Sequence, residues 1–196
     1  EMLRSFARHT FDADVAVVEG NRGLLDGLDG TSTAALARTL RAPVLLVLDV
    51  TKVTRTAAAF VAGCRALAPE VHIAGVIANR VGGPRHESQV REAIEGETGV
   101  PLLGAIPKLA DRHLLPDRHL GLVPPEEHDR MVEVVRRLGE VMRERTDLEA
   151  LLGAARNAGP LDAIPDAPDA NDRASRDEAV PVRVGVFRDS AFTFYY

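Results

Sequence analysis

Short runs of apolar residues alternate along this chain with longer segments in which apolar side chains recur with a helical period. Such alternation is typical of a parallel sheet whose strands are connected by helices that cover it. The predicted strands cover residues 15–19, 44–50, 71–79 and 102–106, with residues 120–123 as a weaker fifth. Each run is nearly all apolar, as expected of strands that are buried on both faces. The pattern therefore predicts an α/β fold with a mostly parallel sheet.

The predicted helices lie between these strands and after them. They cover residues 2–9, 32–40, 54–68, 85–98, 126–145 and 147–157. The helix at 126–145 follows two prolines, begins with two glutamates and ends with arginines, so its charges suit the helix dipole at both ends. Asp147 is the expected N-cap of the last helix, because its carboxylate can accept a hydrogen bond from a backbone N–H of the first turn.

The composition changes after residue 157 and suggests a domain boundary. Residues 158–181 are rich in proline and acidic residues and show no apolar periodicity, which is typical of a linker. Residues 182–187 then read as a new strand. We expect residues 1–157 to form one domain, 158–181 to form an acidic linker, and 182–196 to begin a second domain.

The first predicted strand ends on a carboxylate, Glu19, that is followed by a glycine-rich loop. In an open α/β sheet the ligand crevice lies at the carboxyl ends of the strands, so Glu19 is expected there, where it can hold Mg²⁺ or a metal-bound water. Gly20, Gly23 and Gly27 allow close approach of the backbone to a ligand, and Asp26 adds a second acceptor. The alternative is a structural turn in which a carboxylate caps the following helix.

Polar residues also end the other predicted strands. Asn79 and Arg80 end one of them, and an asparagine amide has the donor and acceptor needed to read an adenine edge, although it can also simply close a turn. Pro107 follows another strand and could lie against a base. Asp49 precedes a basic, hydroxyl-rich loop that opens a helix, where either an anion binds or Thr54 is the N-cap. Together these strand ends point to one crevice.

Composition and charge exclude several classes of function. The formal net charge is −5 and the 24 basic residues are scattered among 29 acidic ones, so a nucleic-acid partner is not expected. No apolar run approaches the ~20 residues that span a bilayer, and the lone Cys64 is expected to be a small buried hydrophobe. We expect a cytoplasmic protein. The sequence also lacks the G-x-x-x-x-G-K-[ST] loop that cradles nucleotide phosphates.

Six segments, in chain order, resemble cobyrinic acid a,c-diamide synthases: VAVVEGNRGLLDG, APVLLVLDVTKVTRTAAAFVAG, IAGVIANRVGGPRH, GVPLLGAIPK, LPDRHLGLVPPEE and VRVGVFRDSAFTFYY. The resemblance covers nearly the whole chain. Members of that family are ATP-dependent carbon–nitrogen ligases that take their amide nitrogen from glutamine. They combine an ATP-binding domain of the dethiobiotin-synthetase-like P-loop class with a class I glutaminase-like domain.

The resemblance implies how much of such an enzyme this chain contains. Residues 1–157 would be the part of the synthetase domain that follows the P-loop strand, with a partial doubly wound sheet. The glutaminase-like domain would begin at residue 182, after the linker. The P-loop and most of the glutaminase domain would then lie outside the chain, and the chain alone is expected to be inactive.

The resemblance also implies roles for the residues at the strand ends. Glu19 and Asp26 would be catalytic, with Glu19 organising Mg²⁺ and Asp26 helping to hold the corrinoid carboxylate in a substrate loop that also contains Gly20, Gly23 and Gly27. Asn79, Arg80 and Pro107 would bind the ATP cofactor, with Asn79 reading adenine. The implied reaction amidates the a- and c-carboxylates of cobyrinic acid through acyl phosphates, with ammonia derived from glutamine.

Two alternatives remain open. The same chemistry on hydrogenobyrinic acid or nickel-sirohydrochlorin fits the same motifs, because the residues that select the tetrapyrrole are not identified. The chain could instead be a non-catalytic module that binds a nucleotide or a tetrapyrrole. Homo-oligomerisation is compatible with either reading, whereas membrane association is not expected.

Overall fold

The computed structural model describes residues 2–28, 30–109, 117–118, 121–122 and 131–161. The chain divides into two compact units, one formed by residues 1–110 and 139–163 and the other by residues 111–138 and 164–196. The predicted strand at 182–187 and nearly all of the predicted linker lie outside the described residues.

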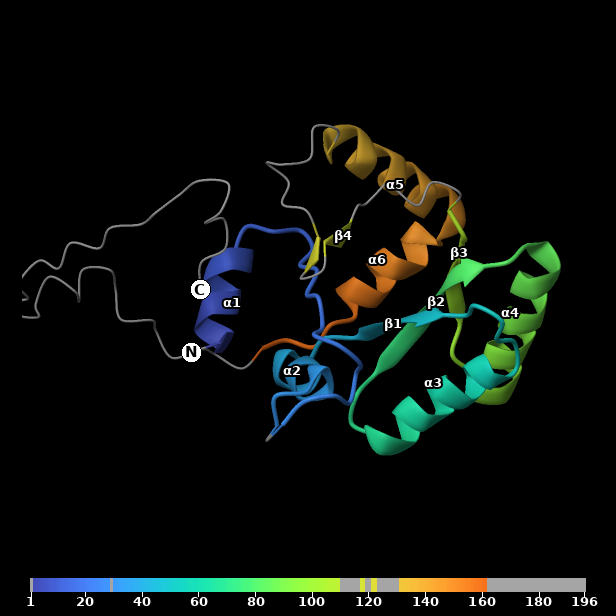
Figure 1. Cartoon of the computed structure of the whole chain (residues 1–196). Coiled ribbons are helices and arrows are strands. Elements are labelled where there is room, and N and C mark those ends of the chain that lie inside the picture. Colours follow the sequence, from blue (N-terminus) through green and yellow to red (C-terminus); the bar gives the residue numbers. More distant parts are fainter. Residues whose placement is uncertain (1, 29, 110–116, 119–120, 123–130, 162–196) are drawn as a thin grey trace, which may run out of the picture. The chain divides into compact units, whose positions relative to one another are not determined.

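The first unit contains a three-stranded parallel sheet in the order β1-β2-β3 (Figure 1). Its strands are β1 (Val44–Asp49), β2 (Ile73–Val81) and β3 (Leu102–Pro107). The central strand β2 is buried along most of its length, as expected for a strand covered on both faces. The predicted α/β fold with a parallel sheet is therefore confirmed.

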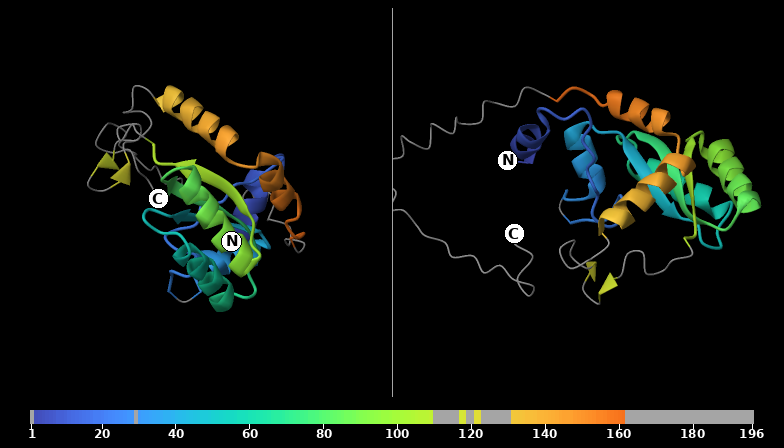
Figure 2. Two further views of the ribbon diagram at one scale, coloured as in Figure 1. Left: turned by 90° about the vertical axis from the view of Figure 1, so that its right-hand side faces the viewer. Right: turned by 90° about the horizontal axis from the view of Figure 1, so that it is seen from above.

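Helices lie on both sides of this sheet (Figures 1 and 2). α3 (Thr56–Leu67) and α4 (Pro84–Thr98) pack against each other on one side, whereas α6 (Leu148–Arg156) lies on the other. The strands and helices bury a common apolar core. Its largest fully buried side chains are Val50, Val61, Val76, Val90 and Ile94.

Side-chain caps fix the ends of two helices. Ser32 caps α2 (Thr33–Leu40) through a 3.2 Å hydrogen bond from the Ala35 N–H. Asp147 caps α6 through a 2.9 Å hydrogen bond from the Ala150 N–H, so its predicted role is confirmed. Two further helices, α1 (Met2–Thr10) and α5 (Met131–Arg145), complete the helical elements of the described residues.

The predicted strand at residues 15–19 is wrong, because this segment is not in a sheet. A strand requires a hydrogen-bonded neighbour, and among the described strands none pairs with residues 15–19. Its side chains are correspondingly exposed, with Val17 at 92%. β1 is itself an edge strand of the described sheet, and its Val47 side chain is 64% exposed. An apolar run predicts a strand only where a partner strand is present.

The described part of the second unit contains a short antiparallel pair, β4 (Asp117–Arg118) and β5 (Gly121–Leu122). β5 falls within the predicted fifth strand at 120–123, whose end residues lie outside the described part of the chain. The expected helix at 126–145 corresponds to α5 from Met131 onward, and residues 126–130 are not described.

Replacement of a core side chain should cost far more stability than replacement of an exposed one. Ile94 in α4 is fully buried, so we expect Ile94→Ala to lower the free energy of unfolding by about 2–5 kcal/mol. Leu67→Ala in α3 is the control, because Leu67 is 73% exposed and its loss should cost within about 0.5 kcal/mol. Urea denaturation would measure both, and equal losses would contradict this description of the core.

Candidate functional site

The carboxyl ends of the three parallel strands bring polar residues to one edge of the sheet. Asp49 of β1 is the register partner of Asn79 in β2, and Val81 of β2 is the partner of Pro107 in β3. The Lys108 N–H donates to the Val81 carbonyl at 3.2 Å and so joins the end of β3 to that of β2. Asn79, the adjoining Arg80 and Pro107 therefore lie at one edge of the sheet, whereas Glu19, which was predicted to join them, does not end a strand of this sheet.

Asp49 is held by one group from the loop after β1 and one from β2. Its Oδ1 accepts a 2.9 Å hydrogen bond from the Thr51 N–H, and its Oδ2 forms a 2.9 Å ion pair with Nη1 of Arg80. Hydrogen bonding from the side chain and backbone of Thr51 is the main cause that lowers the pKa of the Asp49 carboxyl. Desolvation opposes this lowering, and the positive charge of Arg80 adds a smaller lowering. Asp49 is thus a fixed anion that orients the Arg80 guanidinium.

The Asn79 side chain is only partly satisfied by the protein. Its Oδ1 accepts a 2.9 Å hydrogen bond from the Arg80 N–H, and Arg80 itself has a φ of 61°, in the left-handed region. Asn79 lies within β2 rather than in a turn, so this hydrogen bond gives its oxygen a local structural role inside the strand. In the described part of the chain its amide nitrogen has no acceptor, so this nitrogen remains able to donate to a ligand.

The loop that follows Glu19 folds back on itself ahead of α2. Oδ2 of Asp26 accepts a 3.0 Å hydrogen bond from the Gly23 N–H. Gly27 has a φ of 155°, and a Cβ there would lie 2.6 Å from the Ser32 nitrogen, so only glycine fits without displacing the backbone. A Cβ at Gly20 would clash with the Thr33 side chain. The structure therefore brings the predicted substrate-loop residues together.

The proposal that a carboxylate of this loop caps α2 is wrong, because Ser32 provides the cap. The Glu19 carboxylate is exposed and, within the described chain, forms no hydrogen bond or ion pair. No contact described by the structure joins this loop to the strand ends that carry Asn79 and Arg80. The candidate site therefore consists of two groups of residues, a carboxylate-bearing loop and a polar sheet edge.

The acidic, histidine and cysteine side chains of the described residues suit a metal ion only if the ion is also bound by substrate phosphates. No group of three or more histidine, cysteine or acidic residues lies close enough to hold an ion within the described part of the chain. A free carboxylate such as Glu19 nevertheless fits Mg²⁺, because this ion commonly keeps several waters and uses one or two carboxylates together with substrate phosphates. The chemistry of Glu19 thus fits a phosphate-bound magnesium ion rather than a site built entirely from protein ligands.

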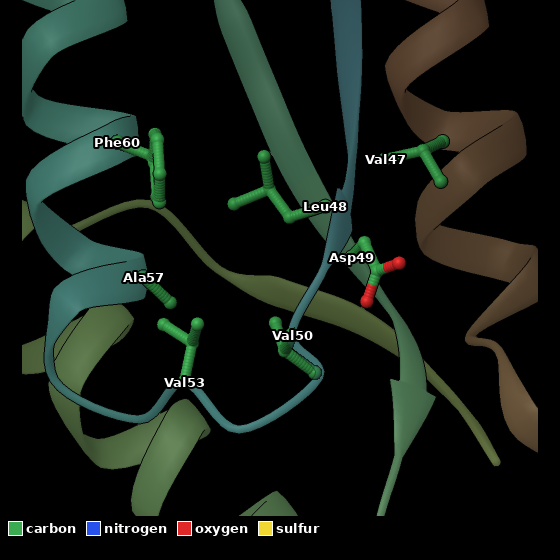
Figure 3. A pocket seen from close by; sticks show the side chains of 7 residues that line it. All are labelled: Val47, Leu48, Asp49, Val50, Val53, Ala57 and Phe60. Atoms are coloured by element: carbon green, nitrogen blue, oxygen red, sulfur yellow. The ribbon is translucent and has the colours of Figure 1, made fainter. Parts of the chain in front are cut away.

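A cavity of about 180 Å³ lies between β1 and α3 (Figure 3). Leu48 points from β1 toward Phe60 of α3, whereas the side chains of Val47 and Asp49 project to the other side of the strand. The lining is otherwise apolar: Val50, Val53 and Ala57. Sites for drug-sized ligands usually enclose 300–1,000 Å³, so this cavity is too small for a tetrapyrrole or a whole nucleotide.

Two further expectations concern residues near this sheet. Thr54 is not the N-cap of α3, because the helix begins at Thr56 and its cap residue Arg55 forms no side-chain cap hydrogen bond. Cys64 is half-buried and packs against the core, and burial raises the pKa of its thiol. A raised thiol pKa disfavours the reactive thiolate, which supports the structural role predicted for Cys64.

Sequence reasoning missed His86, which links the loops after β1 and β2. The Gly82 N–H donates to Nδ1 of His86 at 2.9 Å, and Nε2 lies 2.6 Å from the Val53 carbonyl oxygen. Its position in the segment IAGVIANRVGGPRH was visible in the sequence. Its two partners were not, because one of them lies 33 residues away.

The family comparison agrees with the α/β fold. Residues 3–113 match the family described as AAA domain, which is more than half of the chain. The chain belongs to this family. The predicted P-loop NTPase class of fold is thereby supported.

Similar curated proteins define the relationship more closely. A cobyrinate a,c-diamide synthase of Magnetococcus marinus is 45% identical over 202 residues, covering 100% of this chain and 42% of the relative. Its counterpart in Archaeoglobus fulgidus is 39% identical over 199 residues, with coverage of 100% and 42%. A hydrogenobyrinate a,c-diamide synthase of Thermobifida fusca is 46% identical over 170 residues, with coverage of 83% and 35%.

These relatives confirm the resemblance to cobyrinate a,c-diamide synthases, which are enzymes of cobalamin biosynthesis. The chain spans about 42% of the length of the first two relatives. No solved structure matches it. Within the described residues, no helix is both long and apolar enough to cross a membrane.

The hydrogen bonds to Asp49 should be measurable through its titration. We expect Thr51→Val to raise the pKa of Asp49 toward its ordinary value of 3.8, and Arg80→Gln to raise it by a smaller amount, because the Thr51 hydroxyl is the larger cause of the lowering. Carboxyl ¹³C NMR would follow the titration. Because the folded pKa is lowered, the stabilisation is fully present above pH 3.8 and is lost as pH falls through the folded pKa.

Thr54→Val is the matched control for this titration, because Thr54 is exposed and has no part in the Asp49 contacts. An Asp49 pKa that is the same in the wild type and all three variants would show that these contacts do not form in solution.

Proposed function

We propose that the protein takes part in the ATP- and glutamine-dependent amidation of the a- and c-carboxylates of cobyrinic acid. The observation that carries this proposal is the similarity of the whole chain to cobyrinate a,c-diamide synthases, combined with polar side chains at the carboxyl edge of its sheet. In this proposal residues 1–157 belong to the ATP-binding synthetase domain, 158–181 form a linker, and 182–196 begin a glutaminase-like domain that delivers ammonia. The chain alone would be inactive, and the reaction belongs to the full-length cytoplasmic enzyme.

The chemistry begins with transfer of the ATP γ-phosphoryl group to a substrate carboxylate. A carboxylate is a poor acyl donor to ammonia, and phosphorylation converts one of its oxygens into a good leaving group. Ammonia then attacks the acyl phosphate carbon, and the carbon–oxygen bond to phosphate breaks to leave the amide. Little covalent participation by the protein is required, so catalysis depends on positioning and on stabilising negative charge.

The two groups of the candidate site suit these tasks. Glu19, exposed and unpaired among the described residues, would hold Mg²⁺, which would neutralise phosphate charge during the transfer. Asp26, with Gly20, Gly23 and Gly27, would shape the loop that receives the corrinoid carboxylate. The glycines keep the backbone close and free of side-chain bulk at this point.

The polar sheet edge would bind the nucleotide. The free amide nitrogen of Asn79 would donate to the adenine edge, and Pro107 in the next strand would lie near the base. Arg80, oriented by Asp49, supplies a positive charge on the same edge. This arrangement places no phosphate-cradling lysine in the described chain, so that part of the site would come from elsewhere in the full-length enzyme.

Hydrogenobyrinic acid is the second candidate substrate, because the Thermobifida fusca relative is named for it and is 46% identical. Both substrates present the same carboxylates, so the residues proposed above do not distinguish them. Nickel-sirohydrochlorin amidation and a non-catalytic binding module are further outcomes of the assay below.

Amidation by the full-length protein should require Glu19. We expect mass spectrometry to show addition of two amide groups to cobyrinic acid with ATP, Mg²⁺ and glutamine, and Glu19→Gln to lower the rate at least about 100-fold through lost electrostatic stabilisation. Glu92→Gln is the control, since Glu92 is an exposed glutamate of α4. Turnover of only another tetrapyrrole would change the substrate, and the absence of product with every tetrapyrrole would favour the binding module.

The substitution Asn79→Asp separates two roles of Asn79: hydrogen bonding to the base through its nitrogen and the local hydrogen bond to the Arg80 N–H through its oxygen. Aspartate keeps the oxygen that accepts from the Arg80 N–H but loses the amide donor. We expect the KM for ATP to rise about ten-fold, equivalent to about 1.4 kcal/mol, in the full-length enzyme. Gln89→Glu is the control for the added negative charge, because Gln89 is an exposed residue of α4. An unchanged KM for ATP in Asn79→Asp would show that Asn79 has only a local structural role, through its hydrogen bond with the Arg80 N–H.

A further inference from the structure

His86 ties together two loops that are distant in the sequence. One loop follows β1 and contains Val53, and the other follows β2 and contains Gly82. The half-buried His86 ring contacts both, with Nδ1 2.9 Å from the Gly82 nitrogen and Nε2 2.6 Å from the Val53 oxygen. The contact to Gly82 is local, because the two residues are four apart, whereas the contact to Val53 spans 33 residues.

The partners of His86 fix its protonation state. A backbone N–H can only donate, so Nδ1 accepts from Gly82 and carries no proton. A carbonyl oxygen can only accept, so Nε2 carries the proton and donates it to Val53. The ring is therefore a neutral imidazole in a single tautomer, and it presents one donor and one acceptor in a fixed direction.

The Asp49–Arg80 ion pair is a second link nearby, because it joins the ends of β1 and β2, from which these two loops leave. The His86–Val53 hydrogen bond and the Asp49–Arg80 ion pair enclose a closed loop of backbone that runs through residues 49–53 and 80–86. This closed loop contains two non-glycine residues in the left-handed region, Lys52 at φ 58° and Arg80 at φ 61°. Such conformations are sparsely populated and persist where the surroundings hold them. The closed loop also begins at the register pair of Asp49 and Asn79, so its shape determines where Asn79 and Arg80 lie.

We propose that His86 is a positioning residue for the nucleotide-binding edge of the sheet. It acts through the loop after β1: its hydrogen bond to Val53 holds that loop beside the end of β2 and thereby fixes Asn79 and Arg80. The inference rests on the proposed function, since it assigns His86 to the nucleotide site of that reaction. Because Asn79 and Arg80 would contact ATP away from the reacting atoms, loss of this positioning should weaken binding of ATP more than it slows the chemistry.

Two conservative variants separate the two hydrogen bonds in the full-length enzyme. Glutamine at this position places an amide donor near Nε2, so His86→Gln can keep the bond to Val53. Asparagine places an amide oxygen near Nδ1, so His86→Asn can keep only the local bond to Gly82. His86→Ala removes both bonds, and His72→Ala controls for loss of an exposed histidine just before β2.

Steady-state kinetics with varied ATP, together with calorimetric titration of ATP, tests the proposal. We expect His86→Ala and His86→Asn to raise the KM and the Kd for ATP about ten-fold with kcat within about two-fold, and His86→Gln to restore most of the affinity. Equal affinity in all variants, recovery by asparagine rather than glutamine, or a fall in kcat at constant KM would overturn it. Failure of the wild-type enzyme to bind ATP would instead refute the proposed function, so the two failures are distinguishable.

Discussion

The parallel register of β2 between its two neighbours is the constraint on which the rest of the structure depends. Val76 and Ala78 are fully buried, and the pairing of Asp49 with Asn79 follows directly from the ladder that these apolar residues support. Both faces of β2 are covered, so a shift of one residue would exchange the side chains packed on the two faces and disturb the core on both sides. The same register that buries the core therefore delivers the polar ends of the strands to one edge.

The candidate site, which consists of this edge and the separate loop after Glu19, contains some polar groups that are bonded within the protein and others that are not. The Asp49 carboxylate is satisfied by Thr51 and Arg80, whereas the Asn79 amide nitrogen and the Glu19 carboxylate have no partner in the described chain. Satisfied polar groups stabilise a single loop geometry, and unsatisfied exposed groups remain available to a ligand. The distinction separates residues that shape the proposed site from residues that would contact the substrate or nucleotide.

The sequence predicted most of this fold because local signals dominate it. Alternating apolar runs identified the strands of the sheet, and Asp147 identified the start of α6. The failure at residues 15–19 has a different origin: apolar character is a local property, but strand formation requires a partner from elsewhere in the chain. His86 was missed for the same reason, because its bond to Val53 crosses 33 residues and leaves no local pattern. Local periodicity thus predicts elements better than it predicts long-range hydrogen bonds.

The hydrogen bond between the Asn79 oxygen and the Arg80 N–H has a consequence for base selectivity. A carboxamide usually offers an acceptor and a donor. Here the oxygen of Asn79 already accepts from the Arg80 N–H, so within the described residues only its nitrogen can still donate to a ligand. In the proposed nucleotide site this lone donor would suit a base whose facing ring nitrogen is unprotonated, as N1 of adenine is, whereas the N1–H of guanine in the same place would find no acceptor. The hydrogen bond from the Arg80 N–H would therefore let Asn79 discriminate between the two purines, because it occupies the acceptor of the amide and leaves only the donor for the base.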